Sequence, residues 1–209
     1  MRSSTCRVSV RWSGPRWLWV ALVGAGVVGS PSALLAQHVV VNSFESNVEG
    51  WKIPEWAKSS DDYVAEECRV STEHADDGQA ALEIRTAFPG HRWTGAYVER
   101  DVEMTDWTIF STLKMDVYVP ATAPAGLGGK IILTVGDGGQ WVEMNRTIAL
   151  KPGTWTTLQA NLRPGSMDWK FFPNEAFRKN IHKMGVRIES NREPIYWGGV
   201  FLDNVRLEE

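Results

Sequence analysis

Short stretches of alternating apolar and polar residues recur along the chain after residue 37, separated by turn residues at fairly even spacing. Such alternation is typical of β-strands that bury one face. Helical character is confined to PNEAFRKNI, at about residues 174–181. The pattern therefore predicts an all-β fold, a two-sheet antiparallel β-sandwich of the jelly-roll type with about ten strands and at most one short helix. The clearest strand patterns are AALEIRTAF, AYVERDVEM, TLKMDVYVP and KMGVRIES.

The first 36 residues differ in character from the rest of the chain. They open with a basic stretch without acidic residues, continue with the apolar run WLWVALVGAGVVG, and end in SPSALLA. This order is typical of a secretory signal peptide with cleavage after Ala36. The apolar run is shorter than the ~20 residues of a membrane-spanning helix, so a retained anchor is the second interpretation. We expect residues 1–36 to be a signal peptide and residues 37–209 to form one domain.

After cleavage we expect no stable membrane span. We also expect the protein to be secreted, periplasmic or located at the cell surface. Asp and Glu outnumber Lys and Arg by 25 to 22, and four arginines lie in the signal peptide. This acidic balance argues against a nucleic-acid partner, which would favour a basic excess. After cleavage Cys68 would be the only cysteine, and we expect it to be a buried small apolar residue. The four histidines have no metal-ligand spacing.

The last strand pattern, VFLDNVRLEE, places a carboxylate among apolar residues. By alternation Asp203 shares a face with the apolar side chains of this run, which is costly unless something compensates the charge. Glu45 ends the first strand pattern, so pairing of the terminal strands would bring the two carboxylates together. The loop TEHADDGQAAL, which Gly78 allows to bend tightly, could add carbonyl oxygens for a calcium ion. Pairing with an arginine, capping of a turn, or a bulge near residues 198–199 are the alternatives.

Five segments along the chain, taken together, resemble a known family. The sequence is similar to the jelly-roll carbohydrate-binding modules of the galactose-binding-like superfamily, whose members commonly hold one structural calcium ion. The resemblance implies that Glu45 and Asp203 are its side-chain ligands, with carbonyls of the loop around Gly78. It also implies an exported, non-catalytic module that recognises a poly- or oligosaccharide. The segments are NSFESNVEGW, HADDGQAALEI, LKMDVYVP, LKPGTWTTLQANL and GGVFLDNVRL.

Modules of this kind bind glycans on the outer face of one sheet or in loops at the edge of the sandwich. Flat aromatic rings beside carboxylate, amide and guanidinium groups suit the apolar faces and hydroxyls of sugars. Several residues of these types fall on the outward side of their strands, and one tryptophan lies in the loop FPGHRWTG. An ordinary solvated face with scattered aromatic residues is the alternative. The candidate carbohydrate-binding residues are Trp93, Tyr97, Asp116, Tyr118, Trp141 and Arg187.

Two other functions compete with non-catalytic binding. Glycoside hydrolases and polysaccharide lyases also occur on jelly-roll folds, and Glu99, Glu143 and Glu189 could supply an acid pair. No dense acidic motif, zinc motif or nucleophile elbow supports that alternative, so we rank it second. The third is an interaction domain that kept the sandwich without a sugar site. A binding module of this size would act alone or join a separate carbohydrate-active enzyme.

Overall fold

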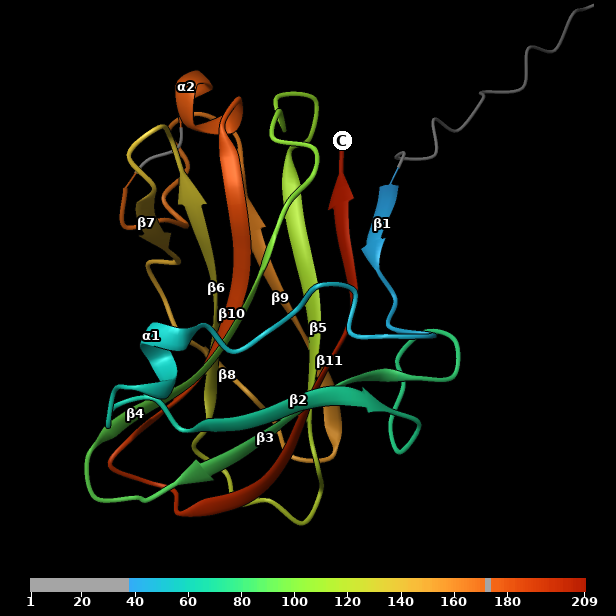
Figure 1. Cartoon of the computed structure of the whole chain (residues 1–209), viewed down its shortest axis with the longest axis vertical. Coiled ribbons are helices and arrows are strands. Elements are labelled where there is room, and N and C mark those ends of the chain that lie inside the picture. Colours follow the sequence, from blue (N-terminus) through green and yellow to red (C-terminus); the bar gives the residue numbers. More distant parts are fainter. Residues whose placement is uncertain (1–37, 172–173) are drawn as a thin grey trace, which may run out of the picture. The chain divides into compact units, whose positions relative to one another are not determined.

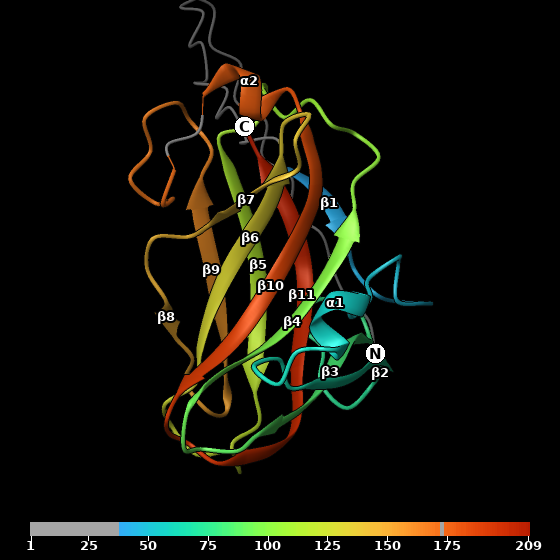
Figure 2. The same ribbon diagram turned by 60° about the vertical axis from the view of Figure 1, so that its left-hand side comes forward.

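The computed structural model describes residues 38–171 and 174–209, so the predicted signal peptide lies outside the described residues. The described chain forms two antiparallel sheets, which are packed against each other as layers (Figures 1 and 2). Sheet A has the order β2-β3-β11-β5-β9, and β1 pairs with the free end of β11. Its strands are β1 (His38–Asn42), β2 (Ala65–Ser71), β3 (Ala81–Phe88), β5 (Thr112–Val119), β9 (Thr154–Asn161) and β11 (Tyr196–Glu208).

Sheet B has the order β4-β10-β6-β7, and the short β8 also pairs with β6. Its strands are β4 (Trp93–Asp101), β6 (Gly128–Val135), β7 (Gln140–Glu143), β8 (Ile148–Ala149) and β10 (Ile181–Asn191). The predicted two-sheet antiparallel sandwich is thereby confirmed. Two four-residue helices occur in the described part of the chain, α1 (Glu55–Lys58) and α2 (Glu175–Arg178), where the sequence predicts at most one. None of the described helices is long and apolar enough to cross a membrane.

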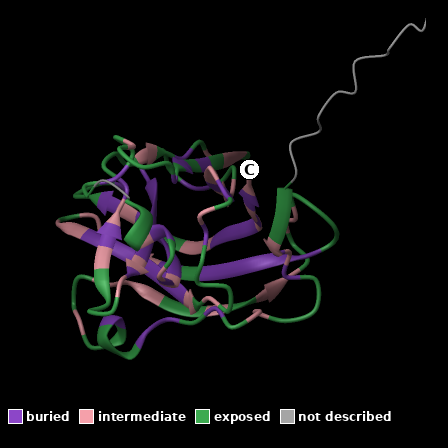
Figure 3. Ribbon diagram, turned by 90° about the horizontal axis from the view of Figure 1, so that it is seen from above, coloured by how far each residue is buried: buried purple, intermediate pink, exposed green. Residues whose placement is uncertain are grey.

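The hydrophobic core lies between the two sheets and follows the predicted alternation. Figure 3 shows buried residues concentrated along the strands and exposed residues mainly in the loops that connect them. The odd-numbered residues of β5 point into this core, as do Met184, Val186 and Ile188 of β10, and their neighbours along each strand point outward. The polar and aromatic residues at the alternate positions of each strand therefore lie on the two outer faces of the sandwich.

A bulge in β11 changes the predicted position of Asp203. The register between β11 and β5 shifts between Asp203 and Arg206, and Asn204 has a positive φ of 48°. The extra residue sends Val205 and Leu207 into the core, while Asp203 lies on the other side of the strand, beneath the loop of residues 72–79. The expectation that Asp203 shares the apolar face with them is wrong, because a bulge offsets the two-residue alternation.

The segment of residues 52–64 runs along the free edge of β4 and carries α1. Its backbone forms hydrogen bonds with β4 at two points, where Lys52 pairs with Glu99, and where Asp62 and Val64 bond to Gly95. These bonds satisfy groups of β4 that an edge strand would otherwise expose. They also place α1 beside β4, as Figure 2 shows. The aromatic residues of this segment are thereby held against the outer side of sheet B.

Glycine residues allow two large side chains to lie flat on this outer face. Tyr97 of β4 and Arg187 of β10 are direct cross-strand partners. A Cβ atom at Gly185 would lie 2.6 Å from Cε2 of the Tyr97 ring, and one at Gly95 would lie 2.9 Å from Cδ of Arg187. Each side chain therefore crosses the neighbouring strand over a glycine, a close approach that glycine permits because it lacks Cβ.

Replacing Gly185 with alanine is expected to lower the free energy of unfolding by about 1–3 kcal/mol, because the buried Tyr97 ring must shift. Urea unfolding of the variant and the wild-type protein measures this difference. Gly138→Ala is the matched control, since a Cβ atom there would meet nothing within 4 Å. Equal stability of the Gly185→Ala variant and the wild-type protein would show that the ring is not confined as described.

Candidate functional site

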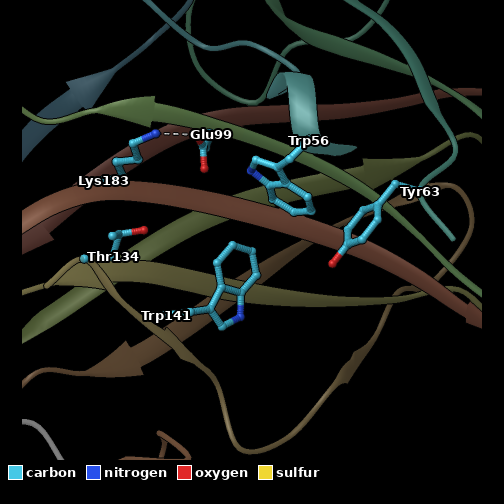
Figure 4. A pocket seen from close by; sticks show the side chains of 7 residues that line it. Trp56, Tyr63, Glu99, Thr134, Trp141 and Lys183 are labelled. Carbon is cyan, nitrogen blue, oxygen red and sulfur yellow. Dashed lines mark hydrogen bonds and ion pairs between the residues drawn. The ribbon is translucent and has the colours of Figure 1, made fainter. Parts of the chain in front are cut away.

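The outer face of sheet B contains an open pocket of about 430 Å³ (Figure 4). Trp56 and Tyr63 of the 52–64 segment form one side of it, and Trp141 of β7 faces them. Its volume falls in the range of about 300–1,000 Å³ that is usual for small-molecule sites. The pocket is completed at one end by residues that can form hydrogen bonds and by a turn glycine: Glu99, Thr134, Lys183 and Gly139.

The aromatic rings of this pocket form one contiguous cluster. The ring of Trp56 lies 4.9 Å from that of Tyr63 and 5.7 Å from that of Trp141, both edge-on, measured between centroids. Such aromatic pairs contribute about 0.5–1.5 kcal/mol of stability in addition to the contribution of the apolar area that they bury. Trp56 nevertheless remains 44% exposed. The cluster therefore presents aromatic surface to solvent on a buried support.

Tyr97 supplies that support from below and is itself hidden. Its side chain is 1% exposed, and its ring lies 5.5 Å from Trp56 and 5.0 Å from Trp141. The hydroxyl donates a hydrogen bond of 3.0 Å to Oε2 of Glu99. Burial and then the Glu99 charge raise the pKa of Tyr97 above its ordinary range, so the hydroxyl remains a donor. Tyr97 thus orders the exposed rings instead of offering a free face.

Ion pairs hold the polar side chains of the same face. The Arg187 guanidinium lies 2.6 Å from Oε2 of Glu143 and 3.0 Å from Oε2 of Glu189. It also lies over the Trp93 ring, with Cζ 5.2 Å from the centroid. At the other end of the face, Nζ of Lys183 lies 2.6 Å from Oε1 of Glu99. A single arginine therefore connects β7, β10 and the aromatic residue at the start of β4.

The structure brings four of the six predicted binding residues together. Trp93, Tyr97, Trp141 and Arg187 all belong to sheet B and project from its outer side. Arg187 contacts Trp93, and Tyr97 contacts Trp141. Their common location follows from strand pairing, since β4 and β7 flank the pair β10 and β6.

Asp116 and Tyr118 do not join this group. Both lie on β5 in sheet A, where they face outward on the opposite side of the sandwich. Asp116 is buried in an ion pair with Arg206, and the Tyr118 ring contacts His74 and Trp155. The expectation that they share a binding face with Trp141 is wrong, because alternation gives the side of a strand but not its sheet.

Sequence patterns missed Trp56, Tyr63 and Lys183 as candidates for the site. Trp56 and Tyr63 come from the irregular 52–64 segment, where no alternation indicates direction. Lys183 lies on β10 with the same outward parity as Arg187, so the strand pattern could have identified it. The segment along β4 is therefore the feature that only the three-dimensional arrangement reveals.

The predicted metal ligands Glu45 and Asp203 approach the same loop. Backbone N–H groups of Gln79 and Ala80 donate to Glu45, while those of Asp76 and Asp77 donate to Oδ2 of Asp203 at 2.8 and 3.0 Å. A Cβ atom at Gly78 would lie 2.2 Å from Oε1 of Glu45, so only glycine permits this approach. The N–H groups of the loop thus compensate part of the charge of both carboxylates.

The carboxylate oxygens at this loop are ligands of the type that calcium prefers, but only two side chains supply them. Asp203 is fully buried, and burial raises its pKa to about 6 against the lowering effect of three backbone N–H donors. The nearby guanidinium of Arg206 pairs with Asp116 instead. Within residues 38–171 and 174–209, no three Asp, Glu, His or Cys side chains are grouped to hold a metal ion. Calcium here would therefore need main-chain carbonyl oxygens beside Glu45 and Asp203.

Comparison with known proteins identifies the fold. No family model matches the sequence, and no curated protein matches it significantly. Among solved structures, a family 27 carbohydrate-binding module of Caldicellulosiruptor saccharolyticus in complex with mannohexaose superposes with a TM-score of 0.57 at 19% identity. The match covers 83% of this chain and 97% of that module.

Two further modules have the same architecture. A family 28 module specific for non-crystalline cellulose superposes with a TM-score of 0.58 at 16% identity, over 79% of this chain and 92% of its own. The family 11 module of Clostridium thermocellum in complex with a β-1,3-1,4-mixed-linked tetrasaccharide gives 0.51 at 16% identity, over 83% and 96%. The chain therefore has the β-sandwich fold of carbohydrate-binding modules, which confirms the resemblance at the level of fold.

Replacing Arg187 with glutamine is expected to lower the free energy of unfolding by about 3–5 kcal/mol, because Glu143 and Glu189 lose their shared buried partner. Lys52→Gln, which breaks an exposed pair with Asp101, should cost less than about 1 kcal/mol. Urea unfolding of both variants measures the two costs. A loss for Arg187→Gln as small as that for Lys52→Gln would contradict the buried network.

Proposed function

We propose that the protein is a non-catalytic carbohydrate-binding module that binds a poly- or oligosaccharide on the outer face of sheet B. The observation that carries this proposal is the pocket where Trp56, Tyr63 and Trp141 present aromatic surface beside Glu99 and Lys183. Aromatic rings suit the apolar faces of pyranoses, and the ion pair offers both acceptors and donors to sugar hydroxyls. The fold supports the proposal, since the structural neighbours are modules for mannohexaose, cellulose and mixed-linked glucan.

The state of the carboxylates favours binding over catalysis. Glu99, Glu143 and Glu189, from which a hydrolase would take two as its acid pair, are each held in an ion pair with a lysine or arginine. Burial acts to raise the pKa of Glu143, but the hydrogen bond from Lys170 and the Arg187 charge outweigh it and hold that pKa below its ordinary value. A general acid in glycoside hydrolysis needs a raised pKa. These carboxylates instead fit fixed hydrogen-bond acceptors.

We also propose that the module is exported and holds one structural calcium ion. Export rests on the basic, apolar and small-residue order of residues 1–36. Calcium rests on two carboxylates from opposite ends of the domain, Glu45 and Asp203, that meet at one loop. The ion would join this loop to the first and last strands of the domain. Both strands belong to sheet A, whereas the aromatic pocket lies on the outer side of sheet B. A separate carbohydrate-active enzyme as partner stays a prediction.

Truncation of either pocket tryptophan is expected to weaken saccharide binding. Trp56→Ala and Trp141→Ala should each weaken binding at least about tenfold, since an anchoring aromatic residue contributes roughly 2 kcal/mol or more. Trp197→Ala is the matched control, because Trp197 is 77% exposed and lies on sheet A.

Affinity electrophoresis of the mature protein in gels containing mannan, amorphous cellulose derivatives, mixed-linked glucan or xylan measures this binding. Retardation of the wild-type protein and the Trp197→Ala variant, but not of the two pocket variants, is the expected result. Folded protein that no polysaccharide retards would refute the sugar-binding proposal and favour an interaction domain.

Removal of calcium is expected to lower the melting temperature of the mature protein, because a ligand that binds only the folded state stabilises it. In Asp203→Ala and in Glu45→Gln the melting temperature should no longer respond to a chelator. The exposed Asp77, whose N–H but not side chain bonds to Asp203, provides the control variant Asp77→Ala. Identical melting curves with and without chelator would count against a bound ion.

A further inference from the structure

A second, larger pocket lies at one end of sheet B, and the proposed site does not use it. Its volume is about 650 Å³, and it lies where β4 begins and β10 ends. Trp93 and Glu189 line it from the sheet, and the loop that leads into β6 closes it from the other side. The remaining lining residues are mainly small or apolar: Ala125, Gly126, Leu127, Gly128, Thr147, Ala149, Leu150, Lys151, Pro152 and Asn191.

The two pockets lie on one continuous aromatic path. Tyr63 lines the first pocket and Trp93 lines the second, and their rings are in edge-on contact with centroids 6.2 Å apart. Arg187 lies over Trp93 and pairs with Glu189, so the polar network of the face also reaches the second pocket. A ligand that rests on Trp56 and Tyr63 can therefore continue over Trp93 without leaving aromatic surface.

The second pocket has the mixed lining that a sugar residue requires. Ala125, Ala149 and Pro152, which are exposed or partly exposed, contribute apolar surface, and Trp93 adds a ring. Three polar side chains also line the pocket. Glu189 accepts a hydrogen bond from Thr147, and Asn191 and Lys151 are exposed. Apolar surface with a few placed polar groups is the usual composition of a ligand site.

We propose that this pocket is a second saccharide-binding subsite, so that one extended glycan chain spans both pockets along β10. This inference rests on the proposed function and adds to it the form of the ligand. The strand from Lys183 at the first pocket to Asn191 at the second covers eight residue steps, about 27 Å at 3.4 Å per residue. That length suits the interior of a chain of several sugar units. A monosaccharide or a chain end would leave one pocket empty.

Isothermal titration of the mature protein with manno- and cello-oligosaccharides of increasing length tests this inference. For the series that binds, affinity should rise about tenfold or more between the trisaccharide and the hexasaccharide, because the longer chain reaches the second pocket. Trp93→Ala and Asn191→Ala should lose this gain and keep the trisaccharide affinity. Trp93→Phe, which keeps a ring, should retain most of it, while Trp141→Ala should weaken every length.

Three results would overturn the inference. Equal affinity for the trisaccharide and the hexasaccharide would show that the second pocket takes no part, while leaving the proposed function intact. A uniform loss at all lengths in Trp93→Ala and Asn191→Ala would show that these residues act through the first pocket. Absence of binding to every oligosaccharide and polysaccharide by folded protein would refute the proposed function and this inference with it.

Discussion

The outer face of sheet B depends on two opposed side chains, Tyr97 and Arg187, that pass each other over glycines. Gly185 leaves room for the Tyr97 ring, and Gly95 leaves room for the Arg187 side chain. Because both lie flat, the tyrosine becomes a floor for the exposed tryptophans, and the arginine reaches two carboxylates and Trp93. A buried ion pair adds little net stability compared with well-packed apolar residues, although removing one partner is costly, and here the pairs fix the geometry of the face. Such a geometry is what a binding surface requires, since side chains held in place lose less entropy when a ligand binds.

The two outer faces of the sandwich differ in what covers them. On sheet A, the loop of residues 72–79 lies against the strands, with His74 packed on Phe201 and Tyr118 at ring distances of 4.7 and 4.4 Å. The same loop also meets Asp203 and Glu45. On sheet B, the segment of residues 52–64 lies along the edge and leaves the central strands beside an open pocket. The loop therefore covers part of sheet A, whereas the open face of sheet B leaves room for the ligand that we propose.

Much of this arrangement is predictable from the sequence, and the exceptions have physical causes. Alternation identified the strands, the core and the outward direction of Tyr97, Trp141 and Arg187, because side chains alternate sides along any strand. It could not separate Tyr118 from that group, since the assignment of β5 to sheet A depends on long-range pairing. A single inserted residue in β11 reversed the faces beyond Asp203, as a bulge does without a clear local signal.

The central claim is that saccharide contacts the tryptophans on the outer side of sheet B, including Trp56 of the 52–64 segment, and none of sheet A. The most direct test is a titration of the ¹⁵N-labelled mature protein with an oligosaccharide that binds, followed through the indole N–H resonances. The account predicts that the signals of Trp56, Trp93 and Trp141 shift, while those of Trp155 and Trp197 stay in place. Shifts confined to Trp155 and Trp197 would contradict the account.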